Sequence, residues 1–566
     1  MSCRCRSRFW VGVIALAFSL AGPRGLDGQT PTAEARAGIQ GYLQSLEALG
    51  FSGAVGVTDN GVVVLQRVFG YADVQTRTPF TLGTGFFIAS LSKQFTAALI
   101  LALEDRGVLR TDDPITRHLS DVPPALAPVT IDQLLGHRSG LLTLDPPEML
   151  ESGAQVLAAG LRAGPSYRPG QRFDYSNAGY AFVAALAEQV TGKRYEELVR
   201  DLLFAPAGMT STSVVTEPAR WQGRRLATGY NGFLPQSDAL LARPFGRELI
   251  GPGGIVTTIE DMMRWERALR AGSVLSAQSL QKFFTPGVEH YAYGWSVWES
   301  TRSGELTAAH DGHIMPEAFN SYYARLLQSG AAVVVFASRG DVALAERVAW
   351  DLIDLYRGTA TGGLPEVGTS PVAPAGGFYA AENGARLRIH RLGSLYIAEP
   401  MNQAAANLFV EDTTPVAAAT RRVVRWLDAD DKDRPAALRA TIAAVREQQP
   451  RFGAYAGEEV IYSVKEDGFL RTHVRHFLGR DTLYTRLDIV DGELAGGTDA
   501  GAFVAGGRGL PLTLGWIGMV PVGGPTWVAY DFWGSRTVEV SVAEGSLTVG
   551  GAAGSTLFRH LARSQD

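Results

Sequence analysis

Phe86-Phe87-Ile88-Ala89-Ser90-Leu91-Ser92-Lys93-Gln94-Phe95-Thr96-Ala97-Ala98 places a serine and a lysine in an apolar segment with helical character. Ser90 and Lys93 are three residues apart, so in a helix they share one face, with the amine about one turn from the hydroxyl. A serine hydroxyl is a weak nucleophile at neutral pH and needs a nearby base. A partly desolvated lysine can lose its charge and act as that base, directly or through a partner. The segment therefore predicts a serine nucleophile at the start of a buried helix.

A second segment, Ser279-Leu280-Gln281-Lys282, fits the same Ser-x-x-Lys template. It follows Leu275-Ser276 and is typical of the opening of a solvated amphipathic helix with Ser276 as N-cap. The template alone is therefore weak, and the first match depends on other residues of the chain.

Tyr175-Ser176-Asn177 is the only Tyr-x-Asn in the sequence. A tyrosinate or a Tyr–Lys pair can pass the serine proton to a leaving group, and an asparagine can hydrogen-bond both a lysine and a substrate amide. Taken alone, such a segment is also typical of a structural turn.

The third segment is His310-Asp311-Gly312, followed by His313. It is compatible with an edge strand that faces a substrate, where Gly312 lets a substrate backbone or carbonyl approach closely. An N–H just beyond it could form an oxyanion hole with that of Ser90. The alternative is a loop that happens to contain two histidines.

The order and rough spacing of these three segments resemble the serine β-lactamase and penicillin-binding-protein superfamily. The resemblance is to its class C-like branch, with class C β-lactamases, DD-carboxypeptidases, D-aminopeptidases and family VIII esterases. Two further landmarks support it: Leu134-Leu135-Gly136-His137-Arg138-Ser139-Gly140-Leu141 and Gly253-Gly254-Ile255-Val256-Thr257-Thr258. It covers residues from about 35 to 357.

The resemblance implies a fold and a set of roles. The fold is an α/β sandwich of class α+β, with an antiparallel sheet, helices on both faces and an all-helical region. Ser90 attacks a carbonyl, Lys93 and Tyr175 pass the proton, and Asn177 positions the substrate. The N–H groups of Ser90 and His313 stabilise the oxyanion, and His310 and Gly312 line the substrate site. Water resolves the acyl-enzyme, and neither a metal nor a cofactor is expected.

His310 stands where many β-lactamases have the lysine of a Lys-Thr-Gly motif. Lysine is a fixed cation that suits a substrate carboxylate, whereas histidine is mostly neutral at pH 7. We therefore expect neutral or amino-bearing esters and peptides to be preferred. β-Lactam hydrolysis, and a non-catalytic binding or scaffold role of the same fold, are the alternatives.

Other enzyme classes are disfavoured. No Gly-x-Ser-x-Gly elbow of an α/β-hydrolase occurs in the sequence. No His-Glu-x-x-His pattern is present, and His310 and His313 on a strand would face opposite ways. The glycine-rich turns lack the context of a phosphate-binding loop.

The N-terminus is typical of a secretory signal over residues 1–21: three arginines, an apolar run from Phe9 to Leu20, and small residues before Ala21. A retained membrane anchor is the alternative. Cleavage removes three arginines and no acidic residue, so the formal net charge goes from −5 to −8. Both cysteines, Cys3 and Cys5, leave with the signal, which excludes disulfides and thiol catalysis in the mature chain. We expect a periplasmic or secreted protein with a small-molecule or peptide substrate, no nucleic-acid partner and no stable membrane insertion after cleavage; the oligomeric state is open.

With 566 residues, the chain is long enough for several domains. Asp59-Asn60-Gly61 predicts a hairpin between two strands, and the spacing predicts helices over 32–49 and 342–356 and a strand over 331–338. We expect a hydrolase domain over 32–357 and a Gly/Pro-rich linker over 358–377. Residues 378–566 are expected to form one or two small β-barrels or sandwiches with one helical interruption, over 436–447. They would shape access to the site, mediate assembly or form an appendage with no catalytic effect.

Overall fold

The computed structural model describes residues 33–561, except for 74–75, 146–148, 232–233, 236–244, 315–318, 339–341, 360–362, 393–394, 410–413, 448, 450–453, 467–468, 480, 491–492, 495–502, 506–516, 532–535 and 552–553. The signal predicted over residues 1–21 lies outside the described residues. Among those described, no helix has the length and apolar character needed to cross a membrane.

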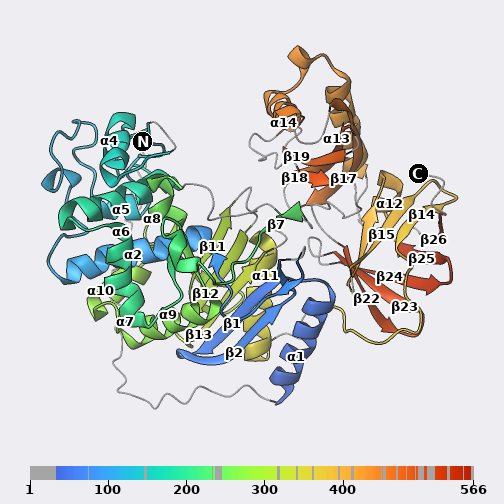
Figure 1. Ribbon diagram of the computed structural model, residues 1–566, viewed down its shortest axis with the longest axis horizontal. Helices are drawn as coiled ribbons and strands as arrows, with labels where there is room; N and C mark the ends of the chain where they lie inside the picture. Colours follow the sequence, from blue (N-terminus) through green and yellow to red (C-terminus); the bar gives the residue numbers. More distant parts are fainter. Residues whose placement is uncertain are drawn as a thin grey trace, which may run out of the picture.

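The N-terminal domain, residues 33–357, is built on a six-stranded antiparallel sheet with the order β10-β11-β12-β13-β1-β2 (Figure 1). Its first and last strands in sequence pair at the centre of the sheet, so the segment between them is held at both ends. The predicted hairpin at Asn60-Gly61 is present, and both residues have positive φ. The strands are β1 (Gly53–Asp59), β2 (Val62–Phe69), β10 (Ser296–Ser300), β11 (Glu305–Ile314), β12 (Phe319–Leu326) and β13 (Ala331–Ala337).

Helices cover both faces of this sheet, which is why β1 is buried along its whole length (Figure 1). On one face, α1 (Ala33–Ala48) and α11 (Val342–Arg357) pack against alternate residues such as Val55 and Val335. On the other face, Ala54 and Phe336 join the core of the helical layer. The predicted α+β sandwich is confirmed, and both predicted helices are observed.

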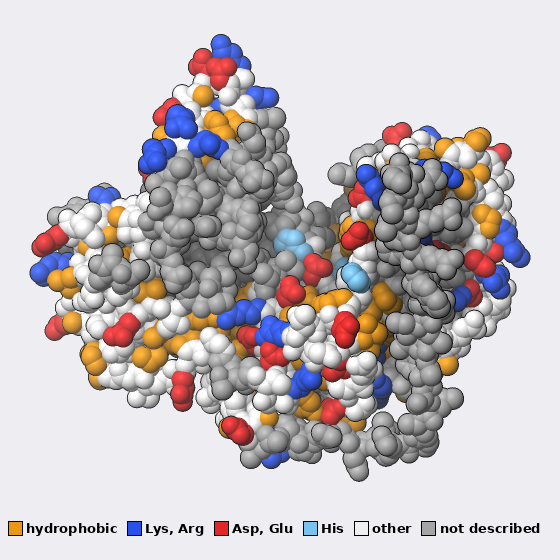
Figure 2. Space-filling view, turned by 180° about the vertical axis from the view of Figure 1, so that it is seen from behind, with side chains coloured by type: hydrophobic (Ala, Val, Ile, Leu, Met, Phe, Trp, Pro, Cys, Tyr) orange, Lys and Arg blue, Asp and Glu red, His pale blue; other side chains and the backbone are white. Residues whose placement is uncertain are grey.

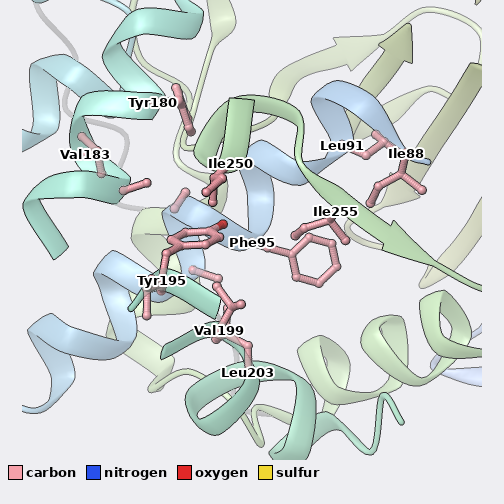
Figure 3. Packing of buried hydrophobic residues seen from close by; sticks show 14 of the residues in the cluster. Ile88, Leu91, Phe95, Tyr180, Val183, Tyr195, Val199, Leu203, Ile250 and Ile255 are labelled. Carbon is pink, nitrogen blue, oxygen red and sulfur yellow. The ribbon is translucent and has the colours of Figure 1, made fainter. Parts of the chain in front are cut away.

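The helical layer surrounds α2 (Ser92–Asp105), whose first twelve residues are all buried. Figure 3 shows Phe95 of α2 packed among Ile250, Ile255 and Tyr195, which come from segments far apart in the sequence. The start of α2 is thus fixed in a dense core, where side chains have little freedom to move. The layer also contains a small sheet of order β5-β9-β6. Its strands and the other helices of the layer are β5 (Phe86–Phe87), β9 (Ile255–Thr257), β6 (Ser213–Val214), α3 (Ile131–Leu135), α4 (Gly153–Ala163), α5 (Asn177–Thr191), α6 (Tyr195–Val199), α7 (Ala205–Ala207), α8 (Ile250–Gly253), α9 (Ile259–Ala271) and α10 (Ala277–Phe284).

The C-terminal part begins with a closed eight-stranded barrel that the sequence predicted as a small barrel. Its strands are not continuous in sequence, because a long insertion separates the third from the fourth. They are β14 (Gly377–Ala381), β15 (Arg386–Leu392), β16 (Leu395–Pro400), β22 (Ile517–Gly523), β23 (Thr526–Asp531), β24 (Arg536–Ala543), β25 (Ser546–Gly551) and β26 (Gly554–His560).

The insertion forms a separate lobe, with a second sheet flanked by helices (Figure 1). It is an open sheet, so a second barrel is not present among the described residues. The expectation of one helical interruption was wrong, because α12 and α13 precede α14 in the insertion. The elements are α12 (Gln403–Ala406), α13 (Thr414–Asp428), α14 (Ala436–Glu447), β17 (Tyr455–Glu466), β18 (Phe469–Leu478), β19 (Asp481–Val490), β20 (Glu493–Leu494) and β21 (Phe503–Ala505).

The barrel packs on the helices that cover the outer face of the N-terminal sheet. Ile397, Val520 and Tyr530 of the barrel belong to the same buried cluster as α1 and α11. The segment expected to be a linker lies between the two parts and bonds to both: Ser45 Oγ donates to Pro365 O (2.6 Å), and Gly368 N donates to Pro521 O (2.7 Å). The barrel is thereby held against the domain.

Candidate active site

Ser90 lies in a short 3-10 helix, Ala89–Leu91, that leads directly into α2. The preceding residue, Ala89, has φ +48°, a conformation that costs a non-glycine residue on the order of 1 kcal/mol. Such backbone strain tends to occur at functional sites and persists only where the surrounding structure enforces it. Here, Ile88 N donates to Ile255 O (3.1 Å), and Ser321 Oγ donates to Ile88 O (2.9 Å). The turn presents Ser90 half-buried at the end of the core.

Lys93 is completely buried and has three hydrogen-bonding contacts. Its Nζ lies 3.1 Å from Ser90 Oγ, 2.7 Å from Asn177 Oδ1 and 3.0 Å from Pro252 O. Asn177 Oδ1 and Pro252 O can only accept hydrogen bonds, whereas the Ser90 hydroxyl can also donate one. A neutral amine can therefore donate to Asn177 and Pro252 and accept the proton of Ser90 at its lone pair.

Burial lowers the pKa of Lys93 to about 7, and the charge of Asp311 opposes this shift. A lysine with this pKa is partly neutral at pH 7, and a general base works best when its pKa is near the working pH. Its environment thus suits Lys93 to take the proton of Ser90.

Tyr175 lies two residues before the start of α5, in the segment that also carries Asn177. The side chain of Tyr175 is 41% exposed. Partial desolvation raises the pKa of its phenol, and the charge of Asp311 raises it further. The raised pKa favours a neutral phenol, so of the two possibilities in the sequence the Tyr–Lys pair fits better than a tyrosinate. The ring also lies 4.7 Å from Lys93 Nζ.

Asn177 begins α5, and Ser176 caps that helix by accepting the N–H of Gly179 (2.9 Å). The cap fixes the direction in which the asparagine side chain leaves the helix. Because its Oδ1 faces Lys93, its Nδ2 is left to donate to another acceptor, such as a substrate carbonyl.

The third segment lies on β11, next to the turn that carries Ser90. The pairing of β11 with β10 ends at Ala309, so the His310–Ile314 part of the strand lies beyond that neighbour. This agrees with the predicted edge strand. Gly312 has a different partner from the one expected: a Cβ there would lie 2.2 Å from Ile88 O and 2.3 Å from Ser321 Oγ. The missing side chain makes room for the Ser90 turn rather than for a substrate.

The two histidines of β11 face opposite ways, as the strand period predicts. His310 is buried, and its Nδ1 donates to Asp311 O (2.5 Å) while its Nε2 accepts from the Tyr291 hydroxyl (3.1 Å). Burial lowers its pKa, and the Lys93 charge adds to that effect, whereas Asp311 opposes it. His313 is exposed and contacts Asn320 Oδ1 through Nδ1 (2.5 Å). His310 is therefore a neutral hydrogen-bonding group at pH 7.

Sequence reasoning missed two contributors to this site. Pro252, whose carbonyl accepts from Lys93, lies in a glycine-rich segment that we read only as a turn. Tyr291, whose hydroxyl contacts His310, has no motif around it. A backbone carbonyl carries no signal in the sequence, and an isolated tyrosine resembles any other core aromatic residue.

Comparisons with known proteins agree with this geometry. The family model described as Beta-lactamase matches residues 39–357. D-aminopeptidase from Brucella anthropi is 31% identical over 288 residues, which cover 46% of this chain and 52% of that protein. Penicillin-binding protein 4* from Bacillus subtilis (strain 168) is 28% identical over 306 residues, which cover 48% of this chain and 66% of that protein. The matched part of this chain thus spans about half the length of the D-aminopeptidase.

Among solved structures, the octameric penicillin-binding protein homologue from Pyrococcus abyssi has a TM-score of 0.50 and 17% identity, covering 93% of this chain and 100% of that one. At that identity the likeness speaks for the fold alone. The family model covers more than half of the sequence and includes all three segments that meet at Ser90. The chain therefore belongs to the Beta-lactamase family.

Proposed function

We propose that this chain is an exported serine hydrolase that cleaves esters, amides or peptides through an acyl-enzyme on Ser90. The observation that carries the proposal is the buried amine of Lys93, 3.1 Å from Ser90 Oγ and held by two acceptors. A serine that only supported the fold would not need a desolvated lysine, which is costly to bury.

The proposed reaction has two halves. Neutral Lys93 takes the proton of Ser90 as Oγ attacks the substrate carbonyl, and Asn177 Nδ2 donates to the substrate. The N–H groups of Ser90 and His313 stabilise the negative charge on the carbonyl oxygen. The proton then passes through Tyr175 to the leaving alcohol or amine, and water attacks the acyl-enzyme to release the acid and regenerate Ser90.

The charges near the site favour a substrate without a carboxylate. Asp311 is half-exposed, and its charge acts on both Lys93 and Tyr175. His310 and its hydrogen bonds make no fixed positive charge. A protonated amine on the substrate would be attracted by Asp311, and a carboxylate would be repelled. We therefore propose neutral or amino-bearing acyl compounds as substrates.

We further propose that the inserted lobe limits which substrates reach Ser90. β21 of the lobe contacts β8 (Leu234–Pro235), a short strand of the N-terminal domain. Figure 2 shows the surface hollowed between the helical layer and the projecting lobe, with histidine and acidic side chains at its floor. A wall on one side of a site restricts large substrates more than small ones.

The test is a steady-state comparison of p-nitrophenyl acetate, D-amino-acid amides and nitrocefin on the purified protein. We expect the ester and the amides to be hydrolysed with a higher kcat/KM than nitrocefin. Asp311→Asn is expected to lower the ratio of kcat/KM for the amides to kcat/KM for the uncharged ester several-fold, at the same pH. Clearly dominant nitrocefin turnover would contradict the proposed substrate class.

A fluorophosphonate probe tests catalysis without any choice of substrate. We expect the wild-type protein to be labelled and Ser90→Ala to stay unlabelled. A properly folded wild-type protein that is neither labelled nor active would instead favour the binding or scaffold role.

A further inference from the structure

His137 is a buried histidine next to the proposed catalytic groups that the reaction above does not use. It follows α3 in the loop 136–140, its exposed fraction is 1%, and its φ is +55°. A non-glycine residue in this conformation carries strain, so the surrounding structure must hold it there.

His137 contacts the residues immediately before and after Tyr175 in the sequence. Its Nδ1 accepts the N–H of Ser176 (3.0 Å), and its carbonyl accepts the N–H of Asp174 (2.9 Å). One histidine thus holds the backbone on both sides of the tyrosine. Its ring also lies against the Tyr175 ring, with centroids 4.3 Å apart and planes at 35°. The carbonyl, the Nδ1 atom and the ring face of His137 thus each restrain Tyr175.

The ring of His137 has one protonation state that fits these contacts. Because Nδ1 accepts a hydrogen bond, the proton of the neutral ring is on Nε2. Nε2 is buried with no hydrogen-bond partner among the described residues. Burial lowers the pKa of His137 well below its usual value, and the charge that Lys93 carries when protonated adds to this. A second proton would have to replace the N–H of Ser176 at Nδ1.

The two residues that flank Ser176 lie next to the proposed nucleophile and base. The centroid of the Tyr175 ring lies 4.7 Å from Lys93 Nζ, and Asn177 Oδ1 lies 2.7 Å from the same nitrogen. A rotation of the backbone at Ser176 would move both side chains at once.

We propose that His137 is a positioning residue for the proposed hydrolysis: its neutral ring holds the Tyr175-Ser176-Asn177 segment through Nδ1, so that Tyr175 meets Ser90 and Asn177 meets Lys93. The inference rests on the proposed function and adds a residue that acts through others and does not touch the substrate.

Two variants separate the hydrogen bond from the filling of space. In His137→Asn, the Oδ1 can take the place of Nδ1 as acceptor, and asparagine tolerates positive φ. In His137→Phe, a ring remains but the acceptor is lost. We expect His137→Phe to lower kcat on p-nitrophenyl acetate about 100-fold with KM within threefold, because a misplaced catalytic group costs about this much. We expect His137→Asn to recover kcat to within tenfold of the wild-type protein.

The pH profile gives a second readout that a purely structural role would not move. If Asn177 no longer holds Lys93, the amine is better hydrated and its pKa rises, so the acid limb of kcat/KM in His137→Phe shifts above pH 7. Wild-type kcat in His137→Phe would overturn the proposal. Equal losses in both variants, with unchanged pH profiles and parallel decreases in Tm, would also overturn it.

Nitrogen-15 NMR of histidine-labelled, full-length protein tests the ring without activity, and His137→Asn assigns the signal. We expect Nε2 protonated and Nδ1 unprotonated from pH 5 to 9, even if His137→Phe does not fold. Titration near pH 6.5, or a proton on Nδ1, would overturn the inference. A wild-type protein that no fluorophosphonate labels would instead refute the proposed function, which the NMR result does not depend on.

Discussion

The two Ser-x-x-Lys segments of this chain meet the same helix at opposite ends. Ser90 and Lys93 lie at the start of α2, and Ser279 and Lys282 lie on α10, which packs against its end. The predicted N-cap is confirmed, since Ser276 Oγ accepts the N–H of Ser279 (3.1 Å). Ser279 is buried, however, so this part of α10 is less solvated than we expected.

The surroundings of the two pairs differ in charge. Ser279 Oγ donates to Asp105 Oδ1 (2.8 Å), and Lys282 Nζ lies 2.8 Å from both carboxylate oxygens of Glu104. Among the residues that the structure describes, Lys93 has only uncharged acceptors within hydrogen-bonding distance. A carboxylate partner favours the protonated form of a lysine, whereas burial without such a partner favours the neutral amine. The same template is therefore an ion pair at one end of the helix and a candidate base at the other.

The largest difference in activity between the two segments is expected when the hydroxyl of Ser90 or of Ser279 is removed. Ser90→Ala is expected to lower kcat/KM for p-nitrophenyl acetate roughly a thousandfold or more, because the covalent route is lost. Ser279→Ala is the matched control and should keep both full activity and fluorophosphonate labelling. Labelling that survives in Ser90→Ala would assign the nucleophile elsewhere.

The acid limb of the pH profile should report Lys93. We expect kcat/KM for an uncharged ester to fall about tenfold per pH unit below an apparent pKa of about 7, since only the neutral amine accepts the proton. Asp311 raises the pKa of Lys93, so Asp311→Asn should move this limb to lower pH. Stopped-assay rates from pH 5 to 9 measure both profiles, and a flat profile would exclude Lys93 as the base.

Stability should depend on pH through Lys93. The folded pKa of about 7 lies below the ordinary lysine pKa of 10.5, so the unfolded chain binds more protons between these pH values and stability rises with pH across them. Lys93→Met removes this dependence. The gain in the free energy of unfolding that Lys93→Met brings over the wild-type protein should therefore be larger at pH 6 than at pH 10, by on the order of a few kcal/mol. Denaturant unfolding at both pH values measures it.

For the matched change Lys282→Met, we expect less than about 1 kcal/mol at either pH, because its ion pair is partly exposed. An equal pH dependence in the two variants would show that the environments of the two lysines do not differ as described.

A comparably small effect is expected of Ser279→Ala on stability. Its hydroxyl is one of three groups that Asp105 accepts from, the others being the N–H and the Oγ of Ser276. We expect a loss of about 1 kcal/mol, typical of one hydrogen bond. Thermal unfolding measures it, and a drop several times larger would mean that Ser279 holds α10 against α2 by more than this contact.

The sequence predicted most of the N-terminal domain because local signals and tertiary structure agree there. Asn60-Gly61 permits the tight turn of the hairpin, and unbroken apolar runs such as Val333-Val334-Val335-Phe336 belong to strands covered on both faces. The C-terminal part was harder. Strands of one barrel are separated by the inserted lobe, and no periodicity in a single strand tells which distant strand it will pair with.

For the candidate site, the sequence by itself determined the residue types, their order and the helix that carries the first two: Ser90, Lys93, Tyr175, Asn177 and His310. Only the tertiary structure decided what these groups can do. It buries Lys93 with no carboxylate of the described residues at hydrogen-bonding distance, brings Pro252 O and Asn177 Oδ1 to its amine, and fills the space at Gly312 with Ile88 O. The physical reason is that the charge of a lysine depends on desolvation and on its neighbours in space, which no spacing along the chain records.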